Sequence, residues 1–79
     1  MNVTSARVAG GIPTRCVVNF SSWPPPSGYE LADFMTSHSL SLAADGGTVT
    51  NIKWLQTGLG VEFQTPEQCL AFVGRFKSA

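Results

Sequence analysis

The stretch TGLGVEFQTPEQCLAF, residues 57–72, constrains the fold more than any other, because it joins a strand pattern directly to a helix start. Its apolar side chains first alternate at the period of a half-buried strand: Leu59, Val61 and Phe63. Thr65, Pro66 and Gln68 then match a capping box with proline at the first helical position. An apolar stripe at helical spacing follows: Cys69, Phe72, Val73 and Phe76. One face of this strand and one face of this helix are therefore expected to share a core.

An earlier part of the chain repeats the order of strand, stop and helix. TRCVVNF (14–20) is β-branched and aromatic, which predicts a strand, and the prolines at 24–26 end it. Ser27 and Glu30 match a second capping box. The helix after it has its own apolar face: Leu31, Phe34, Met35 and His38. TVTNIKWL (48–55) predicts a further strand, which a short turn joins to 59–63 as a hairpin.

The predicted order is β-α-β-β-α, and residues 1–14 are either a flexible lead or an extra edge strand. Two helices with one apolar stripe each need a shared surface, and one face of an antiparallel sheet supplies it. This pattern predicts an α+β two-layer sandwich of ferredoxin-like type, with residues 15–79 as a single domain. The length of 79 residues allows one small domain, and a hydrophobic fraction of 43% argues against disorder.

Charge and cysteine usage exclude several classes of site. The five basic and five acidic side chains cancel and form no run, so the usual signature of nucleic-acid binding is missing. Cys16 and Cys69 lie far apart and His38 is the only histidine, which predicts no metal site and no cofactor. We expect free thiols in a reducing compartment; a long-range disulfide is the alternative. Because no signal-peptide pattern or membrane-spanning run is found, the expected location is intracellular, either cytoplasmic or nuclear, with no membrane partner.

Over roughly residues 15–76 the chain resembles an RNA-recognition motif, or RRM. The family's first strand, strand exit and first helix resemble the segment VVNFSSWPPPSGYELADF. Its second strand resembles GGTVTNIKW, and its third strand and second helix resemble GLGVEFQTPEQCLAF. The resemblance implies aromatic rings on strands one and three that stack on bases. The matching positions here are Cys16, Gly58 and Gly60, which carry no ring. Since stacking contributes about 1–3 kcal/mol per base, the expected RNA contact is weak or atypical.

The resemblance also implies a fourth strand after the second helix, but only Lys77, Ser78 and Ala79 remain there. Either residues 3–8 supply an edge strand or the sheet has three strands. A free edge exposes unpaired backbone groups, so we expect a homodimer or another form of strand addition.

Two functions remain open. The first is a non-enzymatic RRM-like module in an RNA-associated assembly, which contacts single-stranded RNA through the glycine backbone and four cations: Arg15, Lys53, Arg75 and Lys77. The second is a protein-interaction module or small inhibitor, of viral or mobile-element type, that uses the open sheet face, a free edge or the Trp-Pro loop. In that loop Trp23 and Tyr29 either pack over the sheet end or anchor a partner.

The open sheet face is predicted to carry Cys16, Val18, Asn51, Lys53, Leu55, Gly58, Gly60 and Glu62. No catalytic residue is predicted. Asp33, Ser37 and His38 are close in sequence but point in different directions from a helix, and His38 in a last turn suits the helix dipole.

Overall fold

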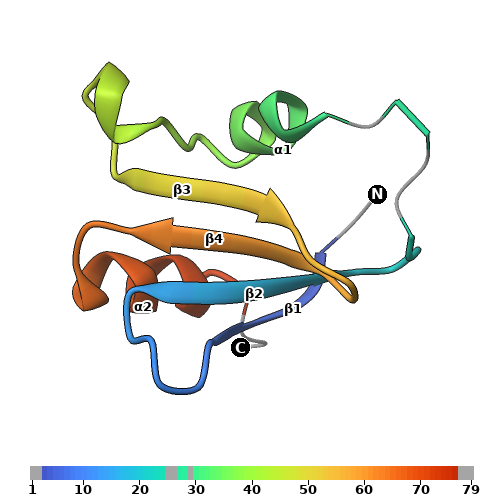
Figure 1. Cartoon of the computed structure of the whole chain (residues 1–79), viewed down its shortest axis with the longest axis horizontal. Coiled ribbons are helices and arrows are strands. Elements are labelled where there is room, and N and C mark those ends of the chain that lie inside the picture. The colour runs from blue at the N-terminus through green and yellow to red at the C-terminus, as the bar shows by residue number, and fades with distance from the viewer. Residues whose placement is uncertain (1–2, 25–26, 29, 77–79) are drawn as a thin grey trace.

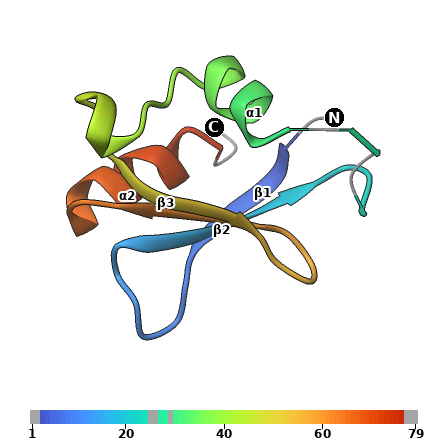
Figure 2. The same ribbon diagram turned by 45° about the horizontal axis from the view of Figure 1, so that its top comes forward.

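The computed structural model describes residues 3–24, 27–28 and 30–76. They form a four-stranded antiparallel sheet and two α-helices, in the order β1 (Val3–Val8), β2 (Arg15–Phe20), α1 (Leu31–Ser37), the 3-10 turn η1 (Ala43–Asp45), β3 (Val49–Trp54), β4 (Leu59–Phe63) and α2 (Pro66–Gly74) (Figure 1). Both helices lie on the same side of the sheet (Figure 2). The predicted α+β class, with one sheet layer and one helix layer, is confirmed.

Residues 3–8 form an edge strand and not a flexible lead. β1 pairs antiparallel with β2, Val8 lies opposite Cys16, and the register shifts between Val3 and Ser5. The strand order is β1-β2-β4-β3, so β1 and β3 are the two edges of the sheet. The sheet thus gains its fourth strand from the N-terminal side of the chain.

The core lies between the sheet and the two helices. Strands β2 and β4 supply alternate apolar side chains, and both helical stripes face them: Cys16, Val18, Phe20, Leu59, Val61, Phe63, Phe34, Cys69, Phe72 and Val73 are all in one buried cluster. The Phe34 ring joins the layers, with its centroid 5.7 Å from Phe20 and 6.5 Å from Phe72. Because burying such a ring contributes about 1.5–3 kcal/mol, Phe34 holds the short helix α1 in place.

The two predicted capping boxes differ in outcome. At α2, the Gln68 amide N–H donates to Thr65 Oγ1 at 3.2 Å and the Thr65 N–H donates to Gln68 Oε1 at 3.2 Å, so this prediction is confirmed. At α1 the prediction of a Ser27–Glu30 box is wrong. The chain is still extended at Glu30, with φ −108° and ψ 150°, and among the described residues the Glu30 side chain caps no helical amide. Ser27 therefore precedes the helix by too many residues to cap it.

Residues 39–47 join α1 to β3. This segment contains η1 and folds back on β3, where Leu42 bridges Val49 and the Val49 N–H donates to Ser41 O at 3.0 Å. This contact covers the beginning of the β3 edge.

Candidate interaction surface

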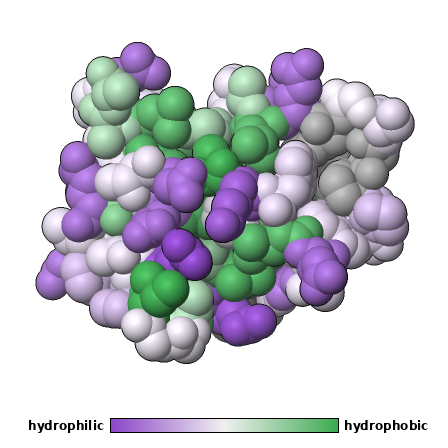
Figure 3. All heavy atoms as spheres, viewed as in Figure 1, coloured by the Kyte–Doolittle hydropathy of each residue, from purple (hydrophilic) through white to green (hydrophobic). Residues whose placement is uncertain are grey.

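The sheet face away from the helices carries one row of residues from all four strands. The register places Arg7 beside Val17, Val17 beside Gly60, and Gly60 beside Lys53. In the next row Arg15, Glu62 and Asn51 are neighbours. Figure 3 looks onto this face and shows hydrophobic and hydrophilic side chains interspersed. The predicted positions of Asn51, Lys53, Gly60 and Glu62 on the open face agree with this register, and Leu55 lies on that face as predicted.

Cys16 and Val18 were expected on the open face, and that expectation is wrong. Both are 0% exposed and lie in the core under the helices. The reason is strand alternation: Phe20 turns inward to meet Phe34, so Val18 and Cys16 turn inward with it. Val17 takes the open-face position instead.

Gly60 on β4 and Gly58 in the loop before it do not present their backbone to a ligand. A Cβ on Gly60 would lie 3.2 Å from Leu55 Cδ1, because Leu55 folds from the β3–β4 loop onto the open face. A Cβ on Gly58 would lie 2.6 Å from the Val18 carbonyl oxygen. Both glycines are buried, so they do not offer the exposed backbone that the RNA hypothesis expected of them.

Two of the cations expected to contact RNA are engaged within the protein. Arg15 Nη2 lies 3.3 Å from Glu62 Oε1 in a cross-strand ion pair. Arg75 Nη1 donates to the His38 carbonyl oxygen at 3.2 Å, and its guanidinium lies 5.9 Å from the Phe72 ring centroid. Lys53 is exposed on the open face, and so is Arg7 at the far end of its row. Tyr29 and Lys77, two further predicted binding residues, lie outside the described residues.

Arg75 and three rings surround His38 where α1 ends. The His38 ring lies 4.6 Å from Phe34 and 5.3 Å from Phe76, centroid to centroid. Desolvation, followed by the positive charge of Arg75, lowers the pKa of His38. A neutral imidazole packed on rings fits a core role in joining the ends of α1 and α2.

Cys16 and Cys69 are free thiols buried between β2 and α2. Desolvation, and next the neighbouring Cys69, raise the pKa of Cys16 to about 12. Desolvation also raises the pKa of Cys69. Since the thiolate is the reactive form, neither sulfur is suited to nucleophilic chemistry.

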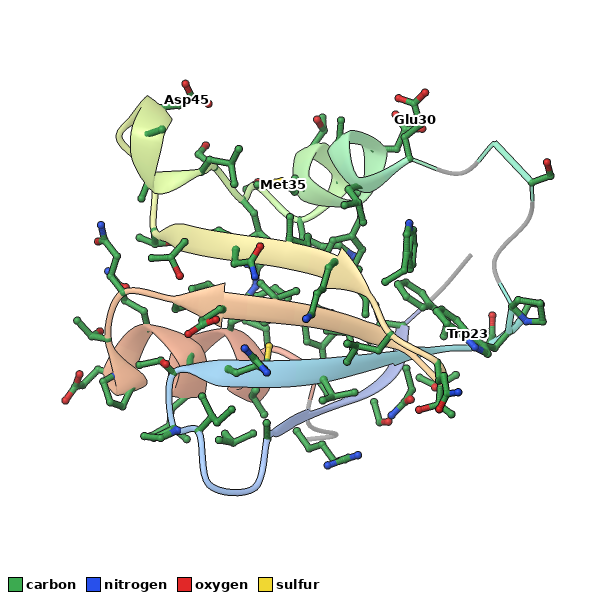
Figure 4. The ribbon with its side chains drawn as sticks, viewed as in Figure 1. Trp23, Glu30, Met35 and Asp45 are labelled. Atoms are coloured by element: carbon green, nitrogen blue, oxygen red, sulfur yellow. The ribbon has the colours of Figure 1, made fainter. Side chains whose placement is uncertain are left out.

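Trp23 packs over the end of the sheet, as the first of the two interpretations of its loop expected. Its indole Nε1–H donates to Gln56 O at 2.7 Å, and its ring stacks on Phe20 at a centroid distance of 6.0 Å. The Trp54 ring is 5.7 Å away. Figure 4 shows Trp23 beside the β3–β4 loop. Trp23 therefore fastens the β2 exit to that loop.

The outer side of β1 is the longest open backbone edge in the described part of the chain. The Ala9 N–H donates to Arg15 O at 2.8 Å, and Arg7 lies opposite Val17 two residues earlier. Because alternate residues of an antiparallel pair exchange hydrogen bonds, the backbone of Arg7 points to β2 while the N–H and C=O of Ala6 and Val8 point outward. On the described residues nothing pairs with that side.

Leu70 lies next to this edge, and the sequence interpretation did not single it out. It is 57% exposed, the higher value of the two large apolar side chains left exposed among the described residues; Leu42 is 38% exposed. At about 100° per residue, Leu70 projects from the flank of α2 opposite Phe72, which faces α1. Since α2 packs on β1, β2 and β4, this flank faces the β1 side. In the sequence, the signal that could have identified Leu70 is that it is apolar but lies outside the apolar stripe of its helix.

Searches for other kinds of site and for relatives returned nothing. Within residues 3–24, 27–28 and 30–76, no pocket and no cluster of metal-ligating side chains was found, and no helix there is long and apolar enough to cross a membrane. No protein-family model matches the chain, and no curated protein or solved structure shows a significant match. The surface itself is therefore the basis for a functional assignment.

Proposed function

We propose that this chain is a non-catalytic protein-binding module that binds another polypeptide by adding a strand to the β1 edge. The observation that carries this proposal is the outward-pointing backbone of Ala6 and Val8 on an edge strand of six residues. An added strand gains affinity from main-chain hydrogen bonds and selectivity from its alternate side chains. Leu70 supplies an exposed apolar contact beside the same edge.

The other surfaces favoured by the sequence are weaker candidates. Leu42 and Ser41 cover the start of the β3 edge. Trp23 is engaged with Gln56 and Phe20, so moving it to contact a partner would break a hydrogen bond and a ring contact. A partner that binds the open sheet face at this point would have to break the Arg15–Glu62 ion pair. Strand addition at β1 requires none of these contacts to break.

The ferredoxin-like, RRM-like interpretation of the fold belongs to this proposal. In it, β1 replaces the fourth strand that the RRM family places after its second helix. The strand order β1-β2-β4-β3 and the two helices on one side support such an arrangement. The likeness would then concern shape, since Leu55 lies over the position where an RRM ring would project.

RNA contact is the second candidate, and one observation favours it. Arg7 and Lys53 are both exposed at opposite ends of the row through Val17 and Gly60. Two separated cations support weak binding that falls modestly with rising salt, because the gain comes from counterion release at only two phosphate contacts. In this candidate the module would follow a single-stranded backbone and would not read bases.

Capture experiments on three baits separate the two candidates. The wild type, Ala6→Pro and the double variant Arg7→Ala/Lys53→Ala are each used to recover partners from extract of the source cell, with and without nuclease. Ala6→Pro removes only an outward N–H, so β1 keeps its hydrogen bonds to β2. Partners that survive nuclease and the double variant, but are lost with Ala6→Pro, support strand addition. Partners that vanish with nuclease and the double variant, but persist with Ala6→Pro, overturn it.

A further inference from the structure

We infer that the strand added to β1 is the β1 strand of a second copy of this chain, in an antiparallel dimer with Ala6 on its twofold axis. The inference rests on the proposed function and names its partner. Three features of the described residues support a second copy: the backbone pattern of β1, the side chains that this register brings together, and the position of Leu70.

The backbone pattern selects Ala6 as the centre. A twofold axis through an antiparallel strand pair can pass through a residue whose N–H and C=O both point outward, because the two copies then exchange reciprocal hydrogen bonds. Ala6 and Val8 have this orientation, whereas the groups of Arg7 are used by β2. An axis at Val8 would pair Ala6 with Gly10, beyond the strand, so Ala6 gives the longer match.

The side chains are compatible with that centre. Ala6 presents only a methyl group at the axis, and Arg7 of each copy faces the second copy's Ser5. The one charged residue of β1 therefore meets a hydroxyl group and not its own equivalent, which avoids like-charge repulsion across the strands. The formal net charge of zero leaves no overall repulsion between copies.

The axis also brings the two exposed Leu70 side chains toward each other. Because it is perpendicular to the sheet, both helix layers stay on the same side. α2 packs on β1, β2 and β4, so its axis lies near β2. With strands about 4.8 Å apart, the two α2 axes would be about 14 Å apart, close to the about 10–12 Å diameter of a helix with its side chains. Leu70, on the β1-side flank, fills the remaining gap from both copies.

Sedimentation equilibrium of the purified chain, over roughly 1 to 500 µM, tests the dimer. A short edge with one apolar contact per copy is expected to give a dissociation constant on the order of micromolar. Leu70→Glu places a charge at the seam and is expected to raise that constant by about 10-fold or more. Ala6→Pro is expected to have the same effect. Leu42→Glu is the matched control, because Leu42 is also exposed but lies by the β3 edge.

A dissociation constant that rises by about 10-fold or more in Leu70→Glu and Ala6→Pro and is unchanged in Leu42→Glu supports the inference. Circular dichroism checks that each variant is folded; Leu70 is a surface residue, so Leu70→Glu decides the matter if Ala6→Pro does not fold. A chain that stays monomeric over the whole range, or a dimer unaffected by Leu70→Glu, overturns the inference. A monomeric chain that still captures a different protein through Ala6 would overturn only the identity of the partner and would leave the proposed function standing.

Discussion

Leu55 lies across Gly60 on the open face of the sheet, with its Cδ1 atom 3.2 Å from the position of a Cβ on that glycine. This one contact changes the meaning of the RRM-like pattern, because the strand position that would carry a base-stacking ring is occupied by an aliphatic side chain from the neighbouring loop. The glycine is therefore a packing residue. It makes room for Leu55 and does not present its backbone.

The two neighbouring glycines should differ in their tolerance of a methyl group. A Cβ at Gly58 would lie 2.6 Å from the Val18 carbonyl oxygen, which is backbone and cannot move alone. Gly58→Ala is therefore expected to lower the free energy of unfolding by about 1–3 kcal/mol. Gly60→Ala meets only the end of the Leu55 side chain and is expected to cost less than about 1 kcal/mol. Urea denaturation measures both; equal costs would contradict the packing described.

Removal of the Thr65 side chain should destabilise α2. Thr65→Ala loses the hydrogen bond from the Gln68 amide and is expected to cost about 1 kcal/mol. Glu30→Ala at the start of α1 is the matched control, and because that side chain caps nothing, its effect should stay within about 0.5 kcal/mol. Chemical denaturation of the two variants gives the comparison. A larger loss for Glu30→Ala would mean that α1 is capped in a way the structure lacks.

His38 should titrate below the ordinary histidine value. Desolvation, with Arg75 as the second cause, lowers its pKa in the folded chain, so the unfolded chain binds the proton more readily. The stability contributed by the neutral ring is present above about pH 6.5 and is lost as the pH falls below it. The chain has one histidine, so a proton NMR titration follows it alone. A pKa at or above the ordinary value would contradict this environment, and Arg75→Ala should raise the pKa.

The two thiols should be inert in the folded protein. Burial raises the pKa of Cys16 to about 12 and also raises that of Cys69. A thiol reagent at mildly alkaline pH is expected to modify neither residue until denaturant is added. The same shift makes the free energy of unfolding depend on pH. Above about pH 9 the unfolded chain loses thiol protons that the folded chain keeps, so the free energy of unfolding should fall from there toward pH 12. Rapid modification of the native chain would show that the core is open.

The parts of the fold that depend on local pattern could be read from the sequence. Alternation at Leu59, Val61 and Phe63 set the orientation of β4, and the Thr65–Gln68 box marked the start of α2. The orientation of β2 could not be read in the same way. Cys16, Val17 and Val18 form a continuous apolar run, and a shift of one residue exchanges the two faces of a strand. Contacts between distant segments, such as that of Phe20 with Phe34, decide between the two orientations.

The candidate surface was less predictable because it is made by contacts between distant segments. The polar, short β1 strand resembles a flexible lead until its pairing with β2 is known. Alternation with Asn51 and Lys53 predicted that Leu55 lies on the open face, but its packing over Gly60 depends on how the β3–β4 loop folds. Leu70 stands outside the apolar stripe of its helix in the sequence, but its place on the β1 side is known only once α1 is seen to lie on the other flank of α2.

Amide hydrogen exchange at Ala6 and Val8 tests strand addition most directly, because these N–H groups point away from β2. We expect both amides to exchange fast in the dilute chain and to become protected as its concentration rises through the dissociation constant. Ile52 is the control, since its amide points outward from the opposite edge and should show no such change. Amides of Ala6 and Val8 that exchange at the same fast rate at every concentration, while sedimentation reports a dimer, would contradict pairing through β1.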